Sequence, residues 1–272
     1  MSLVSTEWLD NNHSEVKIID ASWHMPNTNR NAYEEYKKEH IKNAIFFDID
    51  KFSNKKTELP HMLPNEEEWE KIVSNLGITN EDRIIVYDNS DVISSCRCWY
   101  TFIFFGHNPN LISVLNGGFL KWKKENRETS DKVSNYKKKN YRAKKIPQLV
   151  KSKEEIDKNI LEKKFQVVDA RSKNRFLGLE KEPRLGVRSG SIQNSYCLPF
   201  GELINPKDKT FIENNLIKEK FINIGINNEK NIVFSCGSGI TAAVLGLAYS
   251  IINDKYLPAI YDGSWAEYGK VK

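Results

Sequence analysis

A cysteine stands at the head of a short glycine-rich stretch in the second half of the chain. The stretch runs from Ser235 to Thr241, reads SCGSGIT and follows the apolar run Ile232–Phe234. Two glycines permit unusual backbone dihedrals, so successive N–H groups of such a loop can point inward at one anion. A helix that begins near Thr241 would add its positive N-terminal end. A thiolate is stabilised in that setting and is the reactive form of cysteine, so Cys236 is the candidate nucleophile.

Loops of this kind serve two kinds of group transfer. In phosphate-ester hydrolysis an arginine six positions after the cysteine grips the phosphate, but here that position is Ala242. In sulfur transfer the cysteine stores a sulfur atom as a persulfide, and the loop amides hold its anionic outer sulfur. The sequence favours sulfur transfer and keeps a phosphatase as a distant alternative. We expect Cys96, Cys98 and Cys197 to be buried structural residues, the usual state of a free cysteine.

The segments around this loop repeat segments of the first half. Five pairs of short matches occur in the same order, and the members of each pair lie 146 to 151 residues apart. Lys17–Ser22 (KIIDAS) matches Gln166–Arg171 (QVVDAR), and Leu115–Phe119 (LNGGF) matches Tyr261–Trp265 (YDGSW). Such a period is too long for a solenoid, so the pattern predicts a duplicated domain.

The joint between the copies falls in the polar, lysine-rich stretch Glu125–Gln148. We therefore expect a first domain at 1–135, a linker at 136–148 and a second domain at 149–272. The segment of the first copy that aligns with the cysteine loop, Asp88–Arg97, has no glycine and no cysteine at the matching position. The first copy is therefore expected to be a non-catalytic partner of the second.

Within each copy, short β-branched apolar runs alternate with amphipathic stretches. The runs are Val16–Asp20, Ile84–Tyr87 and Leu111–Leu115, then Val167–Asp169, Ile232–Phe234 and Pro258–Tyr261; helical stretches include Glu66–Leu76 and Ile212–Ile222. Continuous apolar runs suit strands buried on both faces of a parallel sheet, and the alternation predicts an α/β fold with flanking helices. In open sheets of this class, ligands bind at the carboxyl ends of the strands, where Cys236 stands.

Composition excludes several other classes of protein. The 272 residues are 39% hydrophobic, and 41 Lys plus Arg against 36 Asp plus Glu leave a net charge of +5. That surplus is too small and too dispersed to indicate a nucleic-acid partner. Four cysteines make no disulfide framework, and the N-terminus is no signal peptide, so we expect a reducing, cytoplasmic location. Ile232–Ile252 is uncharged and long enough for a bilayer, but its small polar residues split it into strand, turn and helix, so no membrane association is expected.

With its loop and its duplication, the chain resembles the rhodanese superfamily, specifically the two-domain sulfurtransferases. Cys236–Ala242 resembles the active-site loop of mercaptopyruvate sulfurtransferases, whereas thiosulfate sulfurtransferases carry basic residues where this chain has Gly237 and Ser238. Other family-like segments are Phe46–Asp50, His61–Pro64, Leu115–Phe119, Val167–Arg171 and Tyr261–Trp265. The resemblance implies a tandem pair of rhodanese-like α/β domains, each with a mostly parallel sheet flanked by helices, of which the second is catalytic.

The resemblance also implies a set of site residues. Arg175 and Arg184 match the arginines that bind the substrate carboxylate and keto oxygen, and guanidinium forks suit a planar carboxylate. The residues whose amides would surround the sulfur are Gly237, Gly239, Ile240 and Thr241. A Ser–His–Asp relay for proton handling would consist of Ser238, His61 and Asp50, with the last two contributed by the first copy.

The expected reaction is sulfur transfer from 3-mercaptopyruvate, through a persulfide on Cys236, to an acceptor, with release of pyruvate. The acceptor would be cyanide or a thiol such as thioredoxin or a small thiol. No metal or organic cofactor is expected. Two alternatives stay open: thiosulfate as the donor, and a non-catalytic carrier that receives its persulfide from another protein.

Overall fold

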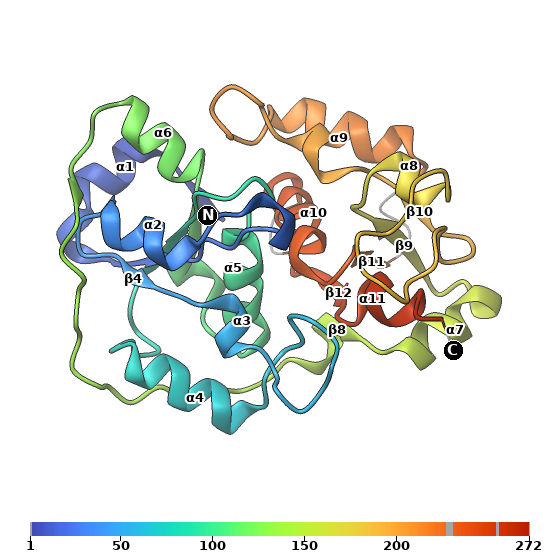
Figure 1. Ribbon diagram of the computed structural model, residues 1–272, viewed down its shortest axis with the longest axis horizontal. Helices are drawn as coiled ribbons and strands as arrows, with labels where there is room; N and C mark the ends of the chain where they lie inside the picture. The colour runs from blue at the N-terminus through green and yellow to red at the C-terminus, as the bar shows by residue number, and fades with distance from the viewer. Residues whose placement is uncertain (1, 227–230, 254–255, 272) are drawn as a thin grey trace. The chain divides into compact units, whose positions relative to one another are not determined.

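The computed structural model describes residues 2–226, 231–253 and 256–271, which form two compact units. The first unit comprises Met1–Asn54, Pro64–Ile146 and Pro206–Phe211. The second comprises Lys55–Leu63, Pro147–Asn205 and Ile212–Lys272. Most of the first unit runs from blue to green in Figure 1, and most of the second from yellow-green to red. Each unit is built around its own sheet.

The first unit contains a five-stranded parallel sheet in the order β1-β6-β5-β2-β4. Its strands are β1 (Leu3–Val4), β2 (Lys17–Asp20), β4 (Ile45–Phe46), β5 (Ile84–Tyr87) and β6 (Ile112–Leu115). Its helices are α1 (Thr6–Asn11), α2 (Ala32–Lys38), α3 (Ile49–Phe52), α4 (Glu66–Asn75), α5 (Ser95–Phe104) and α6 (Gly118–Lys124). A small antiparallel pair, β3 (His40–Ile41) with β7 (Thr129–Ser130), adds to it, as do short 3-10 turns at His13–Glu15, Pro26–Thr28 and Pro109–Leu111.

The second unit contains a five-stranded parallel sheet in the order β10-β9-β11-β12-β8. Its strands are β8 (Val150–Lys151), β9 (Phe165–Asp169), β10 (Tyr196–Cys197), β11 (Asn231–Ser235) and β12 (Ala259–Tyr261). Its helices are α7 (Lys153–Glu162), α8 (Lys173–Phe176), α9 (Asn214–Asn223), α10 (Ile240–Ile252) and α11 (Ser264–Tyr268), with 3-10 turns at Pro147–Leu149 and Phe200–Leu203.

The two sheets have the same topology. Reading one order backwards aligns β1 with β8, β6 with β12, β5 with β11, β2 with β9 and β4 with β10. The central strand of each sheet, β5 or β11, therefore ends at the same place in its domain. The predicted duplicated α/β fold with mostly parallel sheets is confirmed.

Local sequence signals explain where the flanking helices begin. At α4 the Asn65 side chain accepts from the Glu68 amide, while Glu68 accepts from the Asn65 amide. Ser152 and Glu155 form the same reciprocal pair at the start of α7. Such capping boxes satisfy amides that a helix leaves unpaired at its first turn. Each unit thus starts one helix that precedes a sheet strand, α4 before β5 and α7 before β9, by the same device.

The helix that follows the cysteine loop is unusually apolar. Nine of the thirteen residues of α10 are buried, and at Gly246 a Cβ would lie 2.7 Å from the Pro258 ring. This glycine is required because helix and loop approach so closely. The predicted division of Ile232–Ile252 into strand, turn and helix is confirmed by β11 and α10. Across the described ranges, we find no helix with the length and apolar character needed to traverse a bilayer.

Candidate active site

Cys236 lies at the carboxyl end of β11, in the turn that leads into α10. Its side chain is buried, and the amide of Gly239 points at its sulfur with an N···Sγ distance of 3.1 Å. Gly239 is the N-cap of α10 and has a φ of 81°, a conformation that glycine adopts without a steric penalty. Ile240 and Thr241 form the first turn of α10. The thiol therefore sits where amide hydrogens and the positive end of a helix favour an anion.

Residues of α11 hold the backbone of the cysteine loop through hydrogen bonds. The Ser264 hydroxyl accepts from the Cys236 amide at 3.2 Å and donates to the Tyr261 carbonyl at 2.8 Å. The amide of Trp265 donates to the Cys236 carbonyl, and the amide of Ala266 donates to the Gly237 carbonyl, both at 2.9 Å. These bonds fix the loop, so the sulfur is presented by a rigid support.

Two guanidinium groups face the loop at Gly237. A Cβ placed on this glycine would lie 3.4 Å from Nη2 of Arg175 and 3.5 Å from Nη1 of Arg184. Arg175 belongs to α8, whereas Arg184 lies in the segment after it. The structure thus brings the two predicted arginines to one point beside the cysteine. Two planar guanidinium groups at that distance form a positively charged site that suits a small carboxylate. We call this site, formed by Arg175 and Arg184, the donor seat.

Ser238 connects one of these arginines to a histidine. Its Oγ lies 2.9 Å from Nδ1 of His61 and 3.3 Å from Nη2 of Arg184. A guanidinium only donates, so Ser238 Oγ accepts from Arg184, whereas the direction of its hydrogen bond with His61 depends on the histidine tautomer. Both Ser238 and His61 are buried, with 6% and 5% of their surfaces exposed. This arrangement can relay a proton at the loop.

His61 reaches this place on the segment Lys55–Leu63, which belongs to the second unit and not to the unit that precedes it in sequence. Its φ of 60° is left-handed, a strained conformation for a residue with a side chain. Two residues later, the amide of Leu63 donates to Oδ2 of Asp262 at 2.8 Å. That bond ties the segment to the loop after β12 and helps to hold the histidine in its strained conformation.

Asp50, the third expected member of the relay, lies in α3 of the first unit. There its Oδ2 accepts from the indole Nε1 of Trp23 at 2.9 Å. Its participation in the relay stays a prediction.

A buried network of charges behind Arg175 escaped the sequence analysis. Glu182 accepts from Arg171 and from Arg175, and Arg171 forms a bidentate pair with Asp169 at the end of β9. Burial alone would lower the pKa of Arg171, but the Asp169 and Glu182 carboxylates outweigh it and raise that pKa. Arg171 also lies over the Trp265 ring, with 4.4 Å from Cζ to the centroid. Opposite charges at positions 171, 175, 182 and 184 were the available signal, but their pairing depends on tertiary structure.

The other thiols stand in different surroundings. Burial raises the pKa of Cys96 and Cys98 well above the ordinary value, and burial raises the pKa of Cys197 to about 12. All three are thus protonated near neutral pH and are poor nucleophiles. Cys96 and Cys98 are buried as predicted, whereas the prediction of burial was wrong for Cys197, which is half-buried at the edge strand β10. All four cysteines are free thiols. Within the described ranges, no cluster of three or more His, Cys, Asp or Glu side chains is arranged to hold a metal ion.

The matching loop of the first unit holds a buried acidic side chain of its own. After β5, the amide of Ser90 donates to Oδ1 of Asp88 at 2.8 Å and the amide of Ser95 donates to Oδ2 at 2.9 Å. Burial raises the pKa of Asp88, while the hydrogen bonds from Ser95 and Ser90 oppose the rise. Asp88 is buried. A carboxylate thus occupies, in this copy, the kind of site that receives the thiol in the other.

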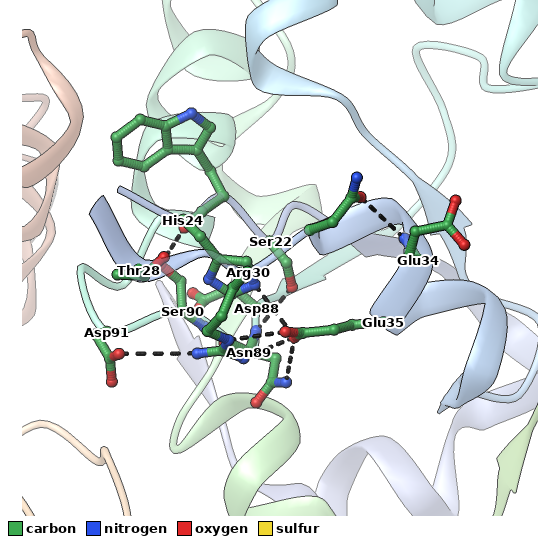
Figure 2. Close-up of polar contacts among 12 residues, drawn as sticks. Ser22, His24, Thr28, Arg30, Glu34, Glu35, Asp88, Asn89, Ser90 and Asp91 are labelled. Carbon is green, nitrogen blue, oxygen red and sulfur yellow. Dashed lines mark hydrogen bonds and ion pairs between the residues drawn. The ribbon is translucent and has the colours of Figure 1, made fainter. Parts of the chain in front are cut away.

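Figure 2 shows how the rest of that loop is locked in place. Arg30 and Asn89 converge on the carboxylate of Glu35, with donor–acceptor distances of 2.6 to 3.1 Å. The amide of Asn89 donates to the hydroxyl of Ser22 at 2.8 Å. Asn89 is the residue that aligns with Cys236, because Tyr87 matches Phe234. In the first unit the position of the cysteine is therefore occupied by Asn89, whose backbone amide bonds to Ser22 and whose side chain bonds to Glu35.

Comparison with known proteins adds independent findings. Residues 5–125 and 152–270 each match the family of rhodanese-like domains. The thiosulfate/3-mercaptopyruvate sulfurtransferase 1, mitochondrial, of Arabidopsis thaliana is 37% identical over 289 residues, which cover 98% of this chain and 75% of the relative. The 3-mercaptopyruvate sulfurtransferase of Mus musculus is 35% identical and covers 98% and 91%. The crystal structure of SseA from Escherichia coli, a 3-mercaptopyruvate sulfotransferase, superposes with a TM-score of 0.87 at 30% identity over 97% of this chain and 99% of that one.

Proposed function

The chain belongs to the rhodanese family of sulfurtransferases, and from that premise we propose that it moves sulfur from 3-mercaptopyruvate, through a Cys236 persulfide, to a thiol or cyanide. The observation that carries the proposal is the convergence at Gly237. There the guanidinium groups of Arg175 and Arg184 lie beside Gly237, the residue that follows Cys236. The Cys236 thiol accepts a hydrogen bond from a backbone amide. A carboxylate site beside a nucleophilic cysteine is what an α-keto thiol requires.

In the first half-reaction the Cys236 thiolate attacks the substrate sulfur. A new S–S bond forms, the carbon–sulfur bond breaks, and its electron pair leaves on the methylene carbon as the enolate of pyruvate. The thiol hydrogen of the donor is transferred to that carbon, so that pyruvate and an anionic persulfide result. The amides of Gly237, Gly239, Ile240 and Thr241 would stabilise the outer sulfur.

Proton movement in this step is assigned to Ser238 and His61. The 2.9 Å contact between Ser238 Oγ and His61 Nδ1 supports a relay in which the hydroxyl passes the donor's proton toward the nascent enolate. Asp50 would orient His61 as the third member. Arg184 donates to the same hydroxyl, which couples donor binding to proton transfer.

In the second half-reaction an acceptor attacks the outer sulfur and restores the Cys236 thiolate. With cyanide as the acceptor the product is thiocyanate. With a thiolate as the acceptor the product is a new persulfide anion on the acceptor. Thioredoxin or a small thiol is the proposed physiological acceptor. Neither half-reaction requires a metal or an organic cofactor.

We assign the nucleophile and the donor site to the domain at 149–272 and the linker role to 136–148. The domain at 1–135 is assigned a non-catalytic role in the sense that it carries no nucleophile, although its range contributes His61 and Asp50 to the proposed relay. Support for the last assignment comes from Asp88 and Asn89, which fill the loop that would otherwise hold a nucleophile. The free state of all four cysteines supports a reducing compartment, and the cytoplasm is the proposed location.

A donor comparison tests the proposed function. Purified full-length protein is given 3-mercaptopyruvate, thiosulfate or a phosphate ester, with cyanide as acceptor, and pyruvate, thiocyanate and phosphate are measured. We expect pyruvate and thiocyanate in equal amounts, and a higher kcat/KM with mercaptopyruvate than with thiosulfate. Preference for thiosulfate would make the protein a thiosulfate sulfurtransferase. Negligible turnover with both donors would favour the carrier, and phosphate release would favour a phosphatase.

A further inference from the structure

Glu182 lies between two arginines that face different parts of the second unit. Its Oε1 lies 2.7 Å from Nη1 of Arg171 and 3.1 Å from Nε of Arg175, and its Oε2 lies 2.5 Å from Nη2 of Arg175. Only 3% of the Glu182 side chain is exposed, against 17% for Arg175 and 1% for Arg171. The carboxylate is thus a fixed, buried support for the more exposed guanidinium.

That guanidinium is the one that reaches the cysteine loop. Nη2 of Arg175, which Glu182 holds, is also the atom that would lie 3.4 Å from a Cβ at Gly237. Glu182 therefore touches no donor itself, but it fixes the position of an atom that would. The support is rigid because Arg171 is anchored in turn by Asp169 and by the Gly190 carbonyl.

The network also sets the net charge of the donor seat. Arg171 and Asp169 cancel, and Glu182 offsets one of the two charges on Arg175 and Arg184. Glu182 therefore lowers the positive charge of the donor seat by one unit. 3-Mercaptopyruvate with a protonated thiol is a monoanion, whereas thiosulfate is a dianion, so the negative charge of Glu182 disfavours thiosulfate about twice as strongly as 3-mercaptopyruvate.

We propose that Glu182 is a positioning and specificity-determining residue, which holds Arg175 in place and tunes the donor seat for a monoanion over a dianion. This inference rests on the proposed function. The Glu182 side chain would have two separate effects, one from its geometry and one from its charge. The geometry of Glu182 governs how well the α-keto acid binds, and its charge governs how strongly a dianion is disfavoured.

Two substitutions separate these effects. Glu182→Gln keeps the side-chain length and removes the charge. We expect kcat/KM for thiosulfate divided by that for 3-mercaptopyruvate to rise about tenfold, because an added unit of positive charge interacts more strongly with the dianion. The gain should shrink as salt is added, since the Debye length falls to about 8 Å at 0.15 M.

Glu182→Asp keeps the charge and shortens the side chain, so that one carboxylate cannot bridge both arginines. We expect an unchanged donor ratio and a KM for 3-mercaptopyruvate about fivefold higher, with kcat little altered, because binding geometry is lost while the cysteine loop is intact. Glu180→Gln is the matched control, since Glu180 is an exposed carboxylate of the same segment. It should behave as wild type in both respects.

The result that overturns the inference is an unchanged donor ratio in Glu182→Gln, or the same change in Glu180→Gln. If Glu182→Gln does not fold, Glu182→Asp decides: an unaltered KM for 3-mercaptopyruvate would contradict the positioning role. Wild-type protein without turnover on either donor would instead overturn the proposed function, and this inference with it. Wild-type turnover combined with an unchanged ratio would overturn this inference alone.

Discussion

The contact between Ser238 and His61 gives the sharpest kinetic prediction. If the two side chains move the same proton, removal of either should cost about as much as removal of both. General acid–base catalysis contributes about 10²- to 10⁴-fold, and we expect Ser238→Ala and His61→Ala each to lower kcat with 3-mercaptopyruvate by about 100-fold. That factor corresponds to about 2.7 kcal/mol of transition-state stabilisation.

The double variant should then lose about 100-fold as well, which leaves a coupling energy of about 2.7 kcal/mol between the two positions. Ser238→Ala should raise KM more than His61→Ala does, because it also removes the acceptor of Arg184. Pyruvate release coupled to lactate dehydrogenase is a suitable assay. Ser235→Ala is the matched control, since the buried Ser235 hydroxyl makes no hydrogen bond to any described residue. A double variant about 10⁴-fold slower than wild type would mean independent roles and refute the relay.

Three further predictions concern the donor seat, the loop and the first unit. Arg184→Ala should lower kcat/KM for 3-mercaptopyruvate by about 10- to 150-fold in the same assay, the effect of losing a bond worth about 1.5–3 kcal/mol to a charged group; an unaltered value would remove Arg184 from the seat. Gly239→Ala forces a Cβ onto a residue with φ of 81°, so it should destabilise the protein by about 1 kcal/mol or more in thermal unfolding and slow persulfide formation; equal stability and rate would contradict the loop geometry. Burial raises the pKa of Asp20 to about 6 from 3.8, so the folded state binds more protons than the unfolded state between these values and stability falls as pH rises through them. In urea unfolding, Asp20→Asn should therefore gain up to about 3 kcal/mol relative to wild type between pH 4 and pH 7, and a constant difference would contradict the raised pKa.

The strands and the duplication could be predicted because their signals are local. Ile84–Tyr87 is a strand with the predicted bounds, and the predicted run Leu111–Leu115 begins one residue before its strand. Each is a run of apolar residues long enough to be recognised. Strands of two residues, such as β3 and β8, carry no such pattern and are defined only by their partners. The resemblance to the rhodanese family is confirmed by the family match to both halves.

The site was only partly accessible from the sequence. Cys236 and its glycines lie in one continuous stretch, so their role could be inferred from local chemistry. His61 was assigned to the first copy by its position in the chain, but the segment that carries it packs in the second unit. Glu182 and Asp169 could not be predicted as partners of Arg171, because charged residues in a loop have many possible partners until the fold selects one. The role of Asp88 as a buried acceptor of loop amides was likewise unpredictable.

The central claim is that one sulfur atom is carried on Cys236, and intact-mass spectrometry tests it directly. After incubation with 3-mercaptopyruvate and no acceptor, the wild-type chain should gain about 32 Da, the mass of a sulfur atom in a persulfide, and peptide mapping should place it on Cys236. Cyanide should remove that mass, and Cys236→Ser should never acquire it. A wild-type chain of unchanged mass, or the same gain in Cys236→Ser, would contradict the account.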